Sequence, residues 1–337
     1  MLHNYDAWKI NESLFPTRGA YEEQLKFCIG YAILAPSSHN TQPWRFEIKD
    51  STIYLSLDWS RTIPYGDRKN QEAYISIGCA LENLLLALKR FSFAYEVSYF
   101  PESFIADAII IRTHKIKKKK HDELFNYLID RVTNRFPPSQ RKMTKQAAQM
   151  IQQVDIEPGT GIEIIIDEKK KKIIADIMEH AINFAFGDVV FKTELSHWIR
   201  SNYTQQHDGI PLFDSGLPDI LTIIGPYLVK NVPSSRQSRQ DKNLILASQA
   251  LAIFTIGTDD RIGWVKTGQS FQRFSLLCTK YNLFTAPMAG IIEHESSKQQ
   301  LKKAINIFGS PSFFCRVAYV NRIPHHSPRR TLEDVMV

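Results

Sequence analysis

The chain of 337 residues is 43% hydrophobic, 23% charged and 11% aromatic, a globular composition that excludes wholesale disorder, collagen and coiled coil. Its formal net charge is +7, but two lysine runs, at 115–120 and 169–172, supply nine positive charges. Because the remaining residues are slightly acidic together, these runs favour solvated ends of helices and strands over a nucleic-acid- or anionic-membrane-binding surface.

The predicted elements follow an N-terminal leader, 1–19, that has no clear periodicity. Apolar residues at helical spacing predict helices at 20–34, 71–91, 122–132, from about 145, and at 170–186, 189–201, 260–281 and 297–308. Alternation or short apolar runs predict strands at 53–57, 96–99, 108–112, 162–166, 221–224 and 314–320. The polar stretches 204–219 and 230–241 predict a long loop and a mobile loop. This irregular order favours an α+β fold, with a mixed sheet flanked by helices.

No apolar run reaches the ~18 residues of a membrane-spanning helix, and the first residues show no signal pattern. The four cysteines, Cys28, Cys79, Cys278 and Cys315, are far apart and form no CxxC pair. We therefore expect free thiols in a reducing compartment, a cytoplasmic protein, and no metal site.

Two segments of the chain resemble each other at an offset of 190 residues. GCALENLLLALKRFSF begins at Gly78 and GQSFQRFSLLCTKYNL begins at Gly268, with apolar residues at matching helical positions. Two amphipathic helices can share such a pattern by chance, and a duplication of the whole fold is the other interpretation. Duplication predicts two related halves, 20–120 and 121–337, about a pseudo-two-fold axis.

The segment APSSHNTQPWRF, 35–46, is the most informative stretch for function. Two prolines bracket a run of small hydroxyl and amide side chains, which suits a planar ligand that carries carbonyls and ring nitrogens. From composition alone, a helix end that passes through a polar turn into an edge strand is the favoured interpretation.

This segment resembles the signature of the nitroreductase-like flavoprotein superfamily. In that family the loop contacts flavin mononucleotide (FMN) from one half of a site built by a dimer. The resemblance implies that the contacts come from Pro36, Ser37, Ser38, Asn40 and Gln42.

Three further segments are similar to parts of the same family's site. They are 131–136 (RVTNRF), 286–290 (APMAG) and 328–335 (PRRTLEDV). The implied cofactor-binding residues are Arg131, Thr133, Arg135, Pro287, Met288, Ala289, Gly290, Arg329 and Arg330. Arginines suit the FMN phosphate, and Arg135 is the candidate for a cation near flavin N1 and O2, where reduction places negative charge. Surface ion pairs and a solvated tail are the alternative for these arginines.

The loop precedes the arginine segment, the reverse of the order in most of the superfamily. This order resembles a single-chain branch, the Acg-like putative NAD(P)H nitroreductases, in which a fused pseudo-dimer forms the site and a lid, here 204–219, can cover the flavin. The resemblance implies ping-pong hydride transfer from NAD(P)H through non-covalent FMN to a nitroaromatic, quinone or similar acceptor. It also implies a monomer that needs no nucleic-acid or membrane partner. The alternative is an FMN-binding or sequestering protein with little turnover.

Overall fold

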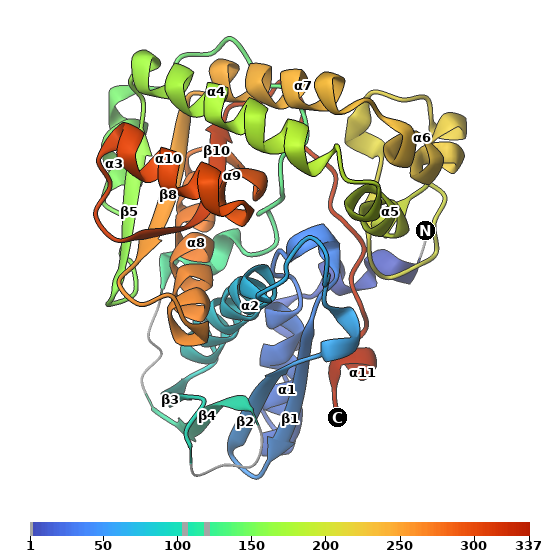
Figure 1. Ribbon diagram of the computed structural model, residues 1–337. Helices are drawn as coiled ribbons and strands as arrows, with labels where there is room; N and C mark the ends of the chain where they lie inside the picture. Colours follow the sequence, from blue (N-terminus) through green and yellow to red (C-terminus); the bar gives the residue numbers. More distant parts are fainter. Residues whose placement is uncertain (1–2, 103–106, 118–121) are drawn as a thin grey trace.

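The computed structural model describes residues 3–102, 107–117 and 122–337, and two four-stranded antiparallel sheets organise it (Figure 1). The first sheet has the order β1-β2-β4-β3, from β1 (Trp44–Lys49), β2 (Thr52–Leu57), β3 (Phe93–Tyr99) and β4 (Ala108–Lys115). The second has the order β5-β8-β10-β9, from β5 (Thr160–Ile165), β8 (Ala250–Ile256), β9 (Phe284–Pro287) and β10 (Ser310–Ala318). The strands β6 (Ile199–Arg200) and β7 (Ile210–Pro211) form a short parallel pair.

The helices form a central and an outer group. The central helices are α1 (Tyr21–Ala32), α2 (Gln71–Arg90) and α8 (Arg261–Lys280), and the outer ones are α4 (Glu168–Ala185), α7 (Ser234–Ala247), α9 (Gly290–Glu293) and α10 (Glu295–Ile305). The others are α3 (Lys145–Gln152), α5 (Val189–Trp198), α6 (Gly225–Asn231) and α11 (Leu332–Val335). Antiparallel sheets with helices confirm the predicted α+β class. None of the described helices is long and apolar enough to cross a membrane.

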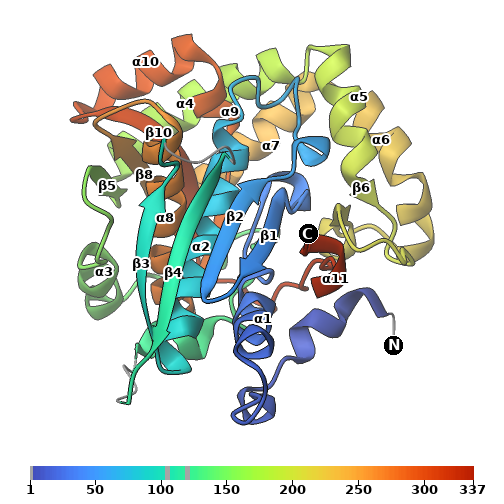
Figure 2. The ribbon, with the colours of Figure 1, turned by 90° about the horizontal axis from the view of Figure 1, so that it is seen from below.

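The core has two layers, which the alternating residues of β8 separate. Ala252 and Phe254 pack into a cluster that contains α2, α8 and both sheets. Leu251 and Ile253 face the other way, into a second cluster beneath α4, α9 and α10. The second sheet is therefore covered on both faces, whereas Figure 2 shows the first sheet as an outer layer in front of α2.

The helices α2 and α8 cross at two glycines. A Cβ on Gly78 would lie 2.0 Å from the carbonyl oxygen of Val265, and a Cβ on Gly268 would lie 2.0 Å from that of Ile75. The contact is reciprocal at the offset of 190 residues found in the sequence. Only glycine permits so close an approach of two backbones, which explains its presence at both positions.

Both ends of the chain pack against the body of the protein. The backbone N–H of Val337 donates to the carbonyl of Phe46 in β1, at 2.9 Å. The leader contains a 3-10 helix, η1 (His3–Lys9), whose Trp8 indole N–H donates to the carbonyl of Ser327 at 2.9 Å. The tail thus returns from the second sheet to the first and passes the leader on the way.

Three predictions of secondary structure are wrong. The expected helix 122–132 is a short 3-10 helix, η5 (Glu123–Tyr127), because the following segment turns Arg131 inward. The expected strand 221–224 belongs to a 3-10 helix, η7 (Asp219–Ile224). The expected mobile loop 230–241 contains most of α7, which packs on α4 with only a narrow buried stripe that includes Ser238 and Ile245.

The two lysine runs have different outcomes. The first lies partly outside the described residues. The second begins α4, where three of its lysines are exposed and Lys171 is buried. The Lys171 ammonium group donates to the carbonyl of Ser248 at 2.8 Å, which secures the helix to the entry of β8.

Candidate functional site

The loop 35–42 has an unusual backbone conformation. His39, Asn40 and Gln42 have φ angles of 47°, 56° and 55°, in the left-handed region that non-glycine residues seldom adopt. Ser37 Oγ accepts from the N–H of Gln42 at 2.9 Å, and the N–H of Ser38 donates to Ser76 Oγ on α2 at 3.2 Å. Such local strain persists where surrounding contacts enforce it, often at ligand sites.

Arg329 of the C-terminal tail holds this loop through hydrogen bonds. Its guanidinium donates to Asn40 Oδ1 at 2.9 Å and to the carbonyls of Leu34 and Ala35, each at 3.1 Å. The Trp8 ring lies against the guanidinium, with 4.6 Å between Cζ and the ring centroid. The structure therefore brings Asn40 and Arg329, two predicted site residues from opposite ends of the chain, into direct contact.

Arg131 and Arg135 lie beside Arg329. Arg131 is almost completely buried and makes one long hydrogen bond, 3.5 Å, to the carbonyl of Leu34, which Arg329 also contacts. Burial and the charge of Arg135 lower the pKa of Arg131 to about 10. Burial, Arg131 and Arg135 lower the pKa of Arg329 well below its ordinary value. Arg131 and Arg329 share the carbonyl of Leu34, and like charges that lower one another's pKa link Arg135 to both. We call these three guanidinium groups the arginine cluster.

No carboxylate of the described residues pairs directly with the arginine cluster, although the charge of Asp214 acts on Arg135. Over residues 3–102, 107–117 and 122–337, no carboxylate lies within ion-pair distance of its three members. Within the same ranges, Nε and Nη1 of Arg131 and Nε of Arg329 are buried without a hydrogen-bond partner. Buried polar groups are normally paired, and buried charges more so. These donors fit an anion with several acceptor oxygens, such as a phosphate.

Two histidines border the arginine cluster but add no positive charge at neutral pH. Burial and the charge of Arg135 lower the pKa of His39 to about 4. Burial, Arg131 and Arg329 lower that of His326 to about 3. The His326 ring stacks on Trp8, with 3.9 Å between the ring centroids. Of these five side chains, the arginines therefore carry the positive charge.

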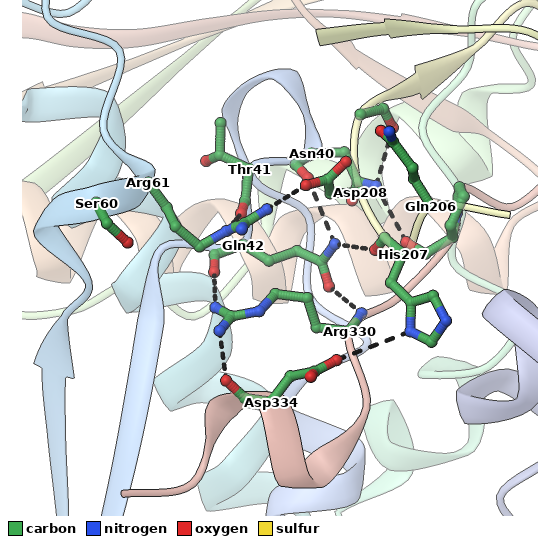
Figure 3. A network of polar contacts seen from close by, with 12 residues as sticks. Asn40, Thr41, Gln42, Ser60, Arg61, Gln206, His207, Asp208, Arg330 and Asp334 are labelled. Carbon is green, nitrogen blue, oxygen red and sulfur yellow. Dashed lines mark hydrogen bonds and ion pairs between the residues drawn. The ribbon is translucent and has the colours of Figure 1, made fainter. Parts of the chain in front are cut away.

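Gln42 and Arg330 join the loop to the tail and to the segment 206–209 (Figure 3). Gln42 donates to the carbonyl of His207 at 2.7 Å and accepts from the backbone N–H of Arg330 at 2.8 Å. The Arg330 guanidinium contacts Asp58 at 3.4 Å and the carbonyls of Gln42 and Asp334. Asp58 thus provides Arg330 with a counter-ion, whereas Arg329 has no carboxylate within ion-pair distance among the described residues and keeps a buried Nε without a partner. Arg329 is therefore better placed than Arg330 to bind a phosphate.

Asp208 secures the same segment by ion pairs. Its carboxylate contacts Arg61 at 2.5 Å and Arg200 at 2.7 Å. Burial opposes ionisation, but hydrogen bonds from both arginines lower the pKa of Asp208. Asn40 adds a hydrogen bond to the carbonyl of Gly209, at 3.0 Å. Part of the predicted lid is therefore fastened directly to the predicted flavin loop.

The turn 287–290 lies at the end of β9, and its four residues are half-buried. The N–H of Met288 donates to the carbonyl of Phe314 at 3.0 Å. The N–H of Asn134 donates to Thr285 in the same strand at 2.9 Å, so β9 lies beside the segment that carries Arg131, Thr133 and Arg135. Thr133 is half-buried. The contacts of Asn134 with Thr285, and of Arg131 and Arg329 with Leu34, thus place all four predicted segments next to one another.

Gly290 borders a cavity of about 700 Å³, which Asp67, Glu72 and Glu293 also line. Burial and the charge of Asp67 raise the pKa of Glu72 to about 8, against a hydrogen bond from Ser38. Burial also raises the pKa of Asp67, to about 6. Acids that line the cavity therefore keep their protons more readily than usual. They lie beside the turn that contains Gly290 and the loop that contains Ser38.

Several of these residues were not predicted as site residues. Trp8 lies in the leader, where the sequence offers no periodic signal, and His326 lies in a proline-flanked tail. A third group consists of charged residues that lie close together in the sequence: Asp58, Arg61, Asp67, Arg68 and Glu72. Asp58 and Arg61 form ion pairs, while Asp67, Arg68 and Glu72 line the cavity.

Relatives of similar length support the resemblance found in the sequence. A Mycobacterium tuberculosis protein named putative NAD(P)H nitroreductase Acg is 22% identical over 328 residues, covering 92% of this chain and 94% of its own. A Serratia protein named probable NAD(P)H nitroreductase PigM is 22% identical over 360 residues, covering 94% of each chain. An uncharacterized M. tuberculosis protein is 23% identical over 332 residues, covering 93% and 92%. The chain thus resembles the putative NAD(P)H nitroreductases over nearly its whole length.

Solved structures overlap with a smaller part of the chain. The FMN- and NADPH-dependent nitroreductase NfnB from Sphigopyxis sp. matches with a TM-score of 0.41 and 12% identity, covering 63% of this chain and 97% of its own. Iodotyrosine deiodinase bound to FMN and 3-iodo-L-tyrosine matches with a TM-score of 0.40 and 13% identity, covering 62% and 95%. No protein-family model matches the chain.

Proposed function

We propose that the chain is an FMN-dependent oxidoreductase of the nitroreductase type, with NAD(P)H as electron donor. The observation that carries this proposal is the arginine cluster, whose buried N–H groups lack partners within the described residues. An FMN phosphate supplies the missing charge and acceptors. Relatives named NAD(P)H nitroreductase provide independent support for the same cofactor chemistry.

The protein's own groups would bind and orient the cofactor. Arg131 and Arg329 would hold the phosphate, and Arg135 would place a positive charge near the pyrimidine edge of the flavin. The loop 35–42 and the turn 287–290 would hold the ring from the two halves of the chain. When bound, FMN supplies hydride transfer from NAD(P)H to a nitroaromatic, quinone or similar acceptor. No side chain is needed as a nucleophile.

A second candidate function, FMN binding with little turnover, is favoured by the fastened segment 206–209. Asn40, Gln42 and Arg61 all bind this segment, so a nicotinamide donor would meet a closed loop. Opening it requires breaking two ion pairs of Asp208. Steady-state consumption of NADH and NADPH at saturating FMN, with a nitroaromatic or quinone acceptor, separates the two functions. Tight FMN binding with negligible turnover identifies the binder, whereas no FMN binding contradicts both.

The two halves of the chain are further proposed to derive from duplication. Both sheets consist of four antiparallel strands in the same relative order, each with a 20-residue helix between its second and third strands in sequence. Gln272 donates to Asn83 at 2.6 Å and Arg273 to Glu82 at 2.7 Å, which are reciprocal pairs at the offset of 190. Such a pseudo-dimer allows one chain to form the site as a monomer. Four free, buried cysteines agree with a cytoplasmic location.

A further inference from the structure

The helical segment Asp219–Asn231, which consists of η7 and α6, is packed with its apolar side outward. Its buried residues include Thr222 and Gly225. Six large apolar side chains of the segment are between 38% and 68% exposed, and we call them the apolar patch: Ile220, Leu221, Ile223, Ile224, Tyr227 and Leu228. A surface helix normally shows the reverse arrangement.

Specific contacts hold this orientation. Thr222 is completely buried, and its hydroxyl accepts from the N–H of Asn202 at 3.0 Å and donates to the carbonyl of Asp219 at 2.5 Å. A Cβ on Gly225 would lie 2.4 Å from Leu212 and 3.2 Å from Ile199, so the helix approaches its support closely. Rotation of the segment would bury the apolar side chains only by breaking these contacts. The apolar patch is therefore a stable surface feature, and large features of this kind mark interaction sites.

The exposed charged residues next to the apolar patch are mainly basic, which indicates a partner with negative charge. Between Ile220 and Gln240 the sequence has three basic residues, Lys230, Arg236 and Arg239, and no acidic residue. All three are exposed, and Figure 1 shows that α7, which carries two of them, begins beside α6. Asp219 precedes this stretch and accepts from Asn202 at 2.7 Å.

We propose that the apolar patch docks on the surface of an anionic lipid membrane. Exposed apolar side chains on a helical segment with basic residues beside them are the features of interfacial attachment. A second copy of the chain fits less well, because a two-fold interface would place the same basic residues near one another. Surface attachment needs no spanning helix, so it is compatible with the absence of one among the described helices. It is independent of the proposed flavin chemistry.

Cosedimentation of the full chain with vesicles tests this proposal. We expect binding to vesicles of phosphatidylcholine mixed with phosphatidylglycerol, weak binding to phosphatidylcholine alone, and release in 0.5 M salt. The double variant Ile223→Ser, Tyr227→Ser should weaken binding at least tenfold. Each of Lys230→Gln, Arg236→Gln and Arg239→Gln should weaken it roughly fivefold.

Phe308→Ser is the matched control, because Phe308 is 91% exposed and lies outside the apolar patch. It should leave vesicle binding unchanged. Circular dichroism checks that each variant is folded. The salt dependence of vesicle binding is measured on the unmodified chain, so it does not depend on whether a variant folds. Absence of binding to the anionic vesicles overturns the proposal. So does a dimer in light scattering that the double variant dissociates, or equal loss of vesicle binding in the Phe308 control.

Discussion

Arg273 and Arg131 are both buried arginines, but their surroundings differ. The guanidinium of Arg273 on α8 contacts Glu82 at 2.7 Å and Glu157 at 2.5 Å. Burial by itself lowers the pKa of Arg273, but these carboxylates raise it above its ordinary value. Arg131 has a single long contact with a carbonyl, and its pKa is lowered. A buried cation with internal counter-ions holds the fold together, whereas one without them indicates a site for an external anion.

Of the substitutions in this comparison, removal of Arg273 is expected to lower the free energy of unfolding most. Arg273→Ala removes the ion-pair partner of buried Glu82 and half-buried Glu157, and should lower the free energy of unfolding by about 3–5 kcal/mol. Urea denaturation measures it. Adding Glu82→Gln should recover part of the loss, because one of the two uncompensated charges disappears. A loss below about 1 kcal/mol in the single variant would show that Arg273 is not structural.

Arg131→Leu should weaken ligand binding without lowering stability. It should weaken FMN binding by about 1.5–3 kcal/mol, the scale of hydrogen bonds to a charged group. Without ligand, the free energy of unfolding should not fall, because the substitution removes an uncompensated buried charge. Fluorescence titration with FMN and urea denaturation provide the two readouts. Arg141→Leu, which removes an exposed arginine that stacks on Tyr319, is the control and should leave FMN affinity unchanged.

Glu72 extends the comparison to a buried acid that lacks a cation among the described residues. Its pKa of about 8 exceeds its ordinary 4.5. Its stabilising contribution is therefore present below about pH 4.5 and is lost as the pH rises through 8. Glu72→Gln should match the unmodified chain at pH 5 and exceed it by about 1–3 kcal/mol at pH 9, in thermal or urea unfolding. Exposed Glu22→Gln should show no such pH dependence. Equal stabilities of Glu72→Gln and the parent at both pH values would refute the assignment.

The smallest effect is expected at an exposed ion pair. Lys26 contacts Glu22 one helical turn away, at 2.6 Å, in open solvent. Lys26→Ala should lower the free energy of unfolding by no more than about 0.5 kcal/mol. A loss comparable to that of Arg273→Ala would mean that burial does not distinguish these cations.

The two sheets explain which strands the sequence could predict. The residues of β2 alternate between buried and half-buried, since one face of the first sheet is covered, and this alternation predicted the strand. All residues of β8 are buried because both faces of the second sheet are covered. A continuous apolar run carries no period, so β8 was not predicted as a strand. The helix α7 was missed because its exposed face is polar and its apolar stripe is narrow.

The site was predicted unevenly, for a related reason. Asn40 and Arg329 belong to motifs, and the structure brings them into contact. Trp8 and Asp208 act through contacts between segments that are distant in sequence, which no local pattern encodes. The roles of Arg329 and Arg330 also could not be separated in the sequence, because their difference arises from the ion pair of Arg330 with Asp58.

Calorimetric titration of the chain with FMN and with riboflavin tests the central claim most directly, because the two ligands differ only in the phosphate. The arginine cluster predicts that FMN binds at least tenfold more tightly than riboflavin, and that Arg131→Leu removes most of this difference. Equal affinities for the two ligands, or no binding of either, would contradict the assignment of Arg131 and Arg329 to a phosphate.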